Sequence, residues 1–111
     1  MAQIYWENLK KADVNISSSG DNTIISAPST GYIAIDHINL FPTSAVTIQL
    51  KDGATNYGGS YPLDAKQPAT IDNVMGSEKG VITLTPATSF VINLSGAVQV
   101  SGFIRYRIVG E

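Results

Sequence analysis

Hydrophobic and polar residues alternate in short segments along this chain, from residue 24 to its end. Each segment closes within about ten residues at glycine, proline, asparagine or aspartate, which is the spacing typical of a β-sandwich or barrel. The segments expected to form strands are 14–17, 23–26, 32–40, 46–51, 69–74, 81–85, 89–94 and 98–109. The sequence therefore predicts an all-β protein, a single antiparallel β-sandwich or jelly roll of about eight strands.

The last of these segments has the clearest alternation. One face carries Val98, Val100, Ile104, Tyr106 and Ile108, and the other carries Gln99, Ser101, Phe103, Arg105 and Arg107. A shift of one residue would bury both arginines, so the apolar face specifies the register. Gly102 lies within the strand and indicates a bulge or a bend.

Segment 32–40 changes the phase of its apolar residues. Ile33 and Ile35 share one parity, whereas Ile38 and Leu40 share the other. Two interpretations remain open: a bulge near residues 36 and 37, or a strand that is buried on both faces.

The first residues have no strand pattern. We expect an N-terminal arm over residues 1–12 and one sandwich domain over residues 13–111. The length is that of one typical domain. The start of the chain lacks a cationic stretch followed by an apolar one, and no apolar run approaches the length of a membrane span, so we expect neither a signal peptide nor a membrane segment.

Composition excludes several kinds of site. The 111 residues contain no cysteine, so disulfides, thiolate metal sites and cysteine nucleophiles are absent from the chain. The formal net charge is −2 and the only adjacent cations are Lys10 and Lys11. A nucleic-acid-binding surface would need a basic patch, so we expect no nucleic-acid partner.

The residue types for catalysis are also sparse. His37 is the only histidine, which excludes a two-histidine metal motif, and Ser95 lacks the spacing of a nucleophile elbow. The aspartates are dispersed, mostly at turns, where hydrogen bonding to the backbone explains them better than calcium binding does. The glycines of segment 56–61 precede no phosphate-binding motif. We therefore expect no catalytic residues, no metal and no cofactor.

The aromatic residues are the best candidates for contacts with a partner. Tyr57 and Tyr61 flank a Gly-Gly pair in an expected loop, where they can close one end of the sandwich, contact a protein or stack on a sugar. Tyr5, Trp6 and Leu9 lie in the arm, and Trp6, the only tryptophan, is a candidate anchor for a neighbouring subunit; burial in the core is the alternative.

Phe103, Arg105 and Arg107 form the second candidate interface. An aromatic ring with two guanidinium groups on one strand face is a mixture favoured in specific interfaces. Two alternatives remain open: a solvated face with one exposed ring, or pairing of the arginines with acids on an adjacent strand.

Two stretches of the second half, TNYGGSYPLDAKQPATIDNV and GVITLTPATSFVINLSGAVQVSGFIRYRIV, resemble small structural proteins of tailed bacteriophages. They are most similar to the jelly-roll decoration, or staple, proteins of epsilon15-like short-tailed phages. The resemblance implies a jelly-roll fold and a protein that coats the assembled capsid from outside, where it links neighbouring major capsid proteins, often as a symmetric oligomer. It transfers no contact residues.

The sequence thus favours a non-enzymatic virion protein. We expect it to be made in the host cytoplasm and to bind the outer capsid surface, with the major capsid protein as partner and a homo-oligomer, preferably a dimer, as its state. The alternative function is a carbohydrate-binding module that uses the loop tyrosines as a stacking platform, so weak binding of a glycan stays open.

Overall fold

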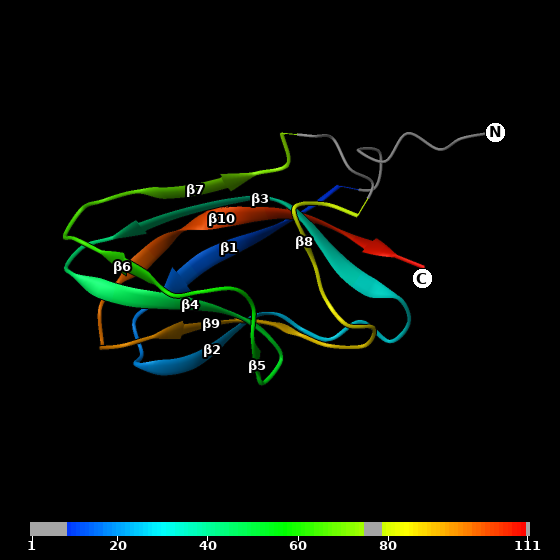
Figure 1. Cartoon of the computed structure of the whole chain (residues 1–111), viewed down its shortest axis with the longest axis horizontal. Coiled ribbons are helices and arrows are strands. Elements are labelled where there is room, and N and C mark those ends of the chain that lie inside the picture. Colours follow the sequence, from blue (N-terminus) through cyan, green and yellow to red (C-terminus); the bar gives the residue numbers. More distant parts are fainter. Residues whose placement is uncertain (1–8, 75–78, 111) are drawn as a thin grey trace.

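The computed structural model describes residues 9–74 and 79–110. In this part of the chain, two antiparallel sheets lie face to face, and Figure 1 shows them as an upper and a lower layer. The ten strands are β1 (Lys10–Ile16), β2 (Gly20–Ile25), β3 (Tyr32–Pro42), β4 (Val46–Asp52), β5 (Thr55–Asn56), β6 (Tyr61–Leu63), β7 (Ala69–Asp72), β8 (Ile82–Thr83), β9 (Phe90–Leu94) and β10 (Val100–Val109).

The strands pair in a nested order. Sheet A has the order β1-β10-β3-β7, with β8 also paired to β3, and sheet B has the order β2-β9-β4-β5, with β6 also paired to β4. The first strand therefore pairs with the last, β2 with β9, β3 with β7, and β4 with β6. Eight strands wound in this way form a jelly roll, which confirms the predicted fold class; β5 and β8 are two-residue additions.

Two elements differ from the sequence-based expectation. Strand β1 begins at Lys10, so residues 10–12 of the expected arm are paired with β10 in sheet A. Strand β6 lies in the segment expected to be a loop, and it places Tyr61 on a strand paired with Ile48. Pro62 interrupts the alternation of this short edge strand, which is why its sequence indicated a turn.

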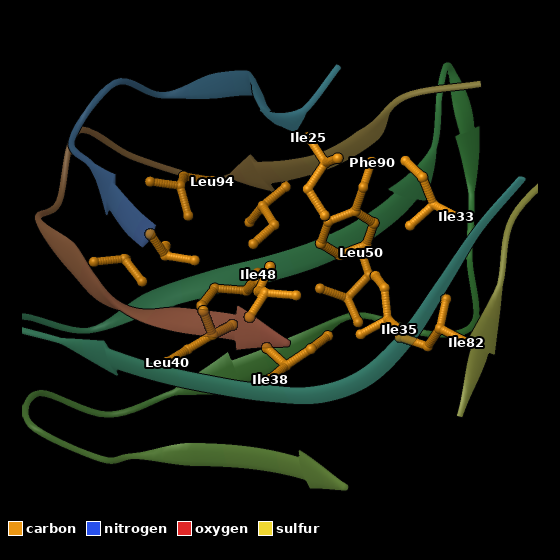
Figure 2. Packing of buried hydrophobic residues seen from close by; sticks show 14 of the residues in the cluster. Ile25, Ile33, Ile35, Ile38, Leu40, Ile48, Leu50, Ile82, Phe90 and Leu94 are labelled. Atoms are coloured by element: carbon orange, nitrogen blue, oxygen red, sulfur yellow. The ribbon is translucent and has the colours of Figure 1, made fainter. Parts of the chain in front are cut away.

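The core lies between the two sheets. Figure 2 shows apolar side chains from both layers meeting there, with Phe90 and Leu50 of sheet B close to Ile33 and Ile35 of sheet A. These four side chains are almost completely buried. Because each strand presents alternate residues to this space, the apolar alternation in the sequence is the direct cause of the two-layer arrangement.

A bulge in β3 explains its change of phase. The pairing of β10 with β3 runs from Arg105 opposite His37 directly to Tyr106 opposite Ile35, so Asp36 is the extra residue. The bulge interpretation is thus confirmed. On the other side of β3, strand β7 ends opposite His37 and β8 pairs with Ile35, so the bulge also separates these two strands.

Gly102 has a different role from the one expected. No register shift occurs at Gly102, which lies in regular pairing with Val14 on one side and Leu40 on the other. Its φ is +152°, and a Cβ there would clash with the backbone carbonyl of Asn39. Glycine is therefore required because β3 approaches the backbone of β10 too closely for a side chain.

Gly102→Ala is expected to lower the free energy of unfolding by about 3 kcal/mol or more, because backbone strain adds to a clash with the neighbouring strand. Urea denaturation followed by circular dichroism measures this change. Gly96→Ala is the matched control: a Cβ there meets nothing within 4 Å, and its effect should stay within about 0.5 kcal/mol. Equal effects of the two variants would contradict the close-approach explanation.

Candidate functional site

The outer face of sheet A brings together most of the candidate residues on the last strand. Because Ile104 is buried in the core, its neighbours Phe103 and Arg105 point away from it. Cross-strand pairing places Lys11 and His37 on either side of Arg105, and Asp13 and Asn39 on either side of Phe103. This face therefore combines aromatic, cationic and anionic side chains from β1, β10, β3 and β7.

An aromatic row runs along this face. The rings of His37 and Phe103 are stacked, with centroids 5.4 Å apart and an interplanar angle of 29°. Phe41, two residues beyond Asn39 on β3, lies diagonally across from Phe103 and is 42% exposed. Diagonal neighbours lie about 7–8 Å apart, within reach of aromatic side chains. We define the outer-face row as Phe41, Phe103 and His37.

Sequence reasoning missed two of the three members of this row. The expected strand 32–40 ends one residue before Phe41, and His37 was not among the residues expected at an interface. The alternation of β3 beyond the bulge, with Ile38 and Leu40 inward, was the signal that places His37 and Phe41 outward.

The charged groups beside the row are paired, with one exception. Lys11 Nζ lies 3.2 Å from Asp13 Oδ1, and His37 Nδ1 lies 3.1 Å from Asp72 Oδ1. Arg105 is exposed, and no hydrogen bond or ion pair joins its guanidinium to another residue in the described ranges 9–74 and 79–110. It therefore remains available to a carboxylate from another molecule.

Arg107 does not belong to this exposed face, which corrects its assignment beside Phe103 and Arg105. It is only 4% exposed; its Nε donates to Asp36 Oδ2 at 2.9 Å and its Nη2 donates to Asp36 Oδ1 at 3.3 Å. Asn73 donates its amide to the same carboxylate at 3.0 Å. The bulge supplies the acid that holds Arg107, and this agrees with the alternative of pairing to an adjacent strand.

The second candidate surface is the open edge of the sandwich between β6 and β7. A small apolar cavity of about 10 Å³ lies there, which is the space of about one water molecule. Tyr61, 40% exposed, is one of the residues that line it. The other lining residues are Ile38, Leu40, Ile48, Leu50, Leu63, Ala69 and Ile71.

The two tyrosines of segment 56–61 have different surroundings. Tyr57 packs against the core cluster, and its backbone is held by Leu50 and by the side-chain amide of Gln49. Tyr61 lies on the edge strand and is exposed. Within the described part of the chain, no stacking contact joins the two rings.

Of the candidate residues in the arm, Tyr5 and Trp6 lie outside the described residues. Leu9 is described; it is partly buried and directly precedes β1. The edge of sheet A formed by β1 is therefore where the arm joins the sandwich.

The residues weighed for catalysis lie apart. Ser95 follows β9 of sheet B, where its Oγ accepts a hydrogen bond from the Thr47 amide at 2.9 Å, whereas His37 lies on sheet A. Residues 9–74 and 79–110 contain no group of three or more metal-ligating side chains. No helix among these residues is long and apolar enough to cross a membrane.

The outer face of sheet B has its own ion network. Asp21 Oδ1 accepts from Asn93 at 2.7 Å, and Lys51 Nζ donates to both carboxylate oxygens at 3.1 and 3.0 Å. The hydrogen bond from Asn93, followed by that from Lys51, lowers the pKa of Asp21 below its ordinary value. Lys51, the cation of β4 on this face, is therefore already paired with Asp21.

Comparison with known proteins adds no relatives: no family model, curated protein or solved structure matches the chain. The class that the fold defines is the antiparallel β-sandwich with jelly-roll pairing. This fold serves many unrelated functions, so the residues on its surface decide which function a given protein has.

Arg107→Met is expected to destabilise the protein by about 3–5 kcal/mol, because it leaves the buried Asp36 carboxylate without its cation. The double variant Asp36→Leu/Arg107→Met should cost clearly less than the sum of the two single variants. Urea denaturation gives the free energy of unfolding of wild type, both single variants and the double variant, which completes the double-mutant cycle. Arg105→Met, an exposed match, should change stability by no more than about 0.5 kcal/mol. An additive cycle would contradict a coupled buried pair.

The stability difference between wild type and Asp21→Asn should depend on pH. Because the folded protein lowers the pKa of Asp21, this carboxylate contributes stability above the unfolded value of about 3.9, and the contribution is lost as the pH falls through the folded pKa. Thermal denaturation between about pH 6 and pH 2 measures it. Asp21→Asn should be less stable than wild type at the upper end, and the difference should shrink toward the lower end. A difference that is constant over this range would refute the role of Asp21.

Proposed function

We propose that this protein is a non-enzymatic structural protein of a phage virion that binds the outer surface of the assembled capsid. In this role it bridges neighbouring major capsid proteins and stabilises the shell. The resemblance of residues 55–74 and 80–109 to phage decoration proteins supports the proposal, and so does the jelly-roll fold.

The observation that carries the proposal is the outer-face row with Arg105 beside it. Aromatic residues and arginine are enriched in protein interfaces and in the residues that dominate their binding energy. Here they are presented by paired strands, so little backbone entropy is lost when they are covered. A rigid polar and aromatic sheet face is suited to docking on a protein surface.

Bridging needs at least two separate contacts. The open edge with Tyr61 lies on the β6 and β7 side, away from β1, where Leu9 marks the junction with the arm. Contacts at both edges would let one molecule touch two capsid subunits, and the linked contacts would add avidity. Because the protein would bind the assembled shell and not free subunits, it would stabilise the shell by mass action.

A self-associated state fits this role. A symmetric homo-oligomer, with a dimer preferred, would double the number of docking faces and increase avidity further. The protein would be made in the host cytoplasm and would then lie on the outer surface of the virion. No cofactor, metal, nucleic acid or membrane enters the proposal.

The purified full-length protein is expected to co-sediment with phage shells assembled without it, and to raise the temperature at which those shells open. Phe103→Ala should weaken this binding about 10- to 100-fold, as expected for an aromatic anchor, while the free protein stays folded at the temperature of the binding assay. Binding isotherms from co-sedimentation and calorimetry of the shells provide the two measurements.

Thr23→Ala is the control, because Thr23 is an exposed strand residue on sheet B. It should bind shells as the wild type does. Light scattering on the same samples gives the oligomeric state. A wild-type protein that leaves shells unbound at saturating concentration would refute the proposed function.

A further inference from the structure

Two cations lie directly opposite each other on the outer face of sheet A. Lys11 of β1 is the cross-strand partner of Arg105 on β10. Residues paired in this way have Cβ atoms about 4.5–5.5 Å apart, and like charges at such positions destabilise a sheet. Asp13 compensates Lys11, so Arg105 is the member of this pair that has no anion among the described residues.

Other cations on the strands show how this fold satisfies such groups. Lys51 on sheet B binds Asp21, and Arg107 on β10 binds Asp36. On the outer face of sheet A, Asp13 meets Lys11 and Asp72 meets His37. Both nearby acids thus have other partners, which leaves the Arg105 guanidinium without a carboxylate among the residues that the structure describes.

The surroundings of Arg105 favour a planar anion. Phe103 lies two residues before it on the same face, and the Phe103 ring is stacked on His37, the residue opposite Arg105. Guanidinium groups bind carboxylates through two parallel hydrogen bonds, and a neighbouring aromatic surface shields such a pair from water. Lys11 lies on the other side, so a carboxylate placed over Arg105 has cations on two adjacent strands.

We propose that Arg105 binds a carboxylate of an acidic protein segment, with Lys11 as a second cation and the stacked Phe103 and His37 rings as an apolar wall. The proposal rests on the proposed function and deepens it: the segment belongs to the capsid surface, and it carries an aspartate or glutamate beside an apolar residue. Binding of that carboxylate supplies Arg105 with the anion that Asp13 supplies to Lys11.

The first test uses a hexaglutamate peptide as the acidic probe and records amide chemical shifts of the full chain. Because the protein has a formal net charge of −2, general attraction of this anion is not expected. The shifts should concentrate on Lys11, His37, Phe103 and Arg105, and should fade as salt is raised. Arg105→Glu should weaken binding at least tenfold.

Lys66→Glu is the matched control, since it makes the same change of charge at an exposed residue in the turn between β6 and β7. It should bind the peptide within about twofold of wild type, because β3 and β7 separate Lys66 from Arg105 and salt screens exposed charges that lie far apart. Arg105→Lys keeps the charge but loses the two parallel hydrogen bonds, so its affinity should lie between those of wild type and Arg105→Glu. Equal losses for Lys66→Glu and Arg105→Glu would overturn the proposal.

The second test repeats the shell co-sedimentation with the same variants. Loss of shell binding in Arg105→Glu but not in Lys66→Glu is the expected result. If wild type ignores shells but binds the peptide at Arg105, the proposed function is wrong and the acidic-segment site stands. If Arg105→Glu binds shells as wild type does, the acidic-segment site is wrong and the proposed function stands.

Discussion

The one-residue bulge at Asp36 determines what sheet A presents to its surroundings. Without it, the pairing of β3 with β10 would run in one phase, and the apolar residues of one half of β3 would point outward. With it, Ile33 and Ile35 share the core with Ile38 and Leu40. The bulge thus allows an eleven-residue strand to stay in the core along its whole length.

The same bulge separates two arginines that the sequence treats alike. It places a carboxylate beside Arg107, where two hydrogen bonds and a contact from Asn73 satisfy the buried charges. Arg105, two residues earlier, lies opposite His37 and stays exposed. Burial of an ion pair is tolerated only when its hydrogen bonds are complete, so Arg107 stabilises the fold through Asp36. Arg105 is exposed and can bind another molecule.

The two edges of the sandwich differ in how they are finished. At both edges consecutive strands joined by a short turn link the two sheets, β1 with β2 at one edge and β6 with β7 at the other. At the other edge, the short strands β6 and β7 leave a small apolar cavity that Tyr61 lines. Short edge strands and a proline in β6 limit uncontrolled pairing with other chains. The exposed Tyr61 ring remains available for a specific contact.

The sequence by itself determined the fold class, because alternation with a period of two is a local property that most strands of the sandwich show. It also located the change of phase in β3 and the polar face of β10, since both can be read from consecutive residues. The tertiary structure alone decided the pairing of strands distant in sequence. That pairing stacked His37 on Phe103, set Phe41 diagonally across from Phe103, and placed Lys11 opposite Arg105. The pairing also buried Arg107 beside Asp36. The sequence pattern could not predict this, because the partner of a side chain depends on the register of another strand.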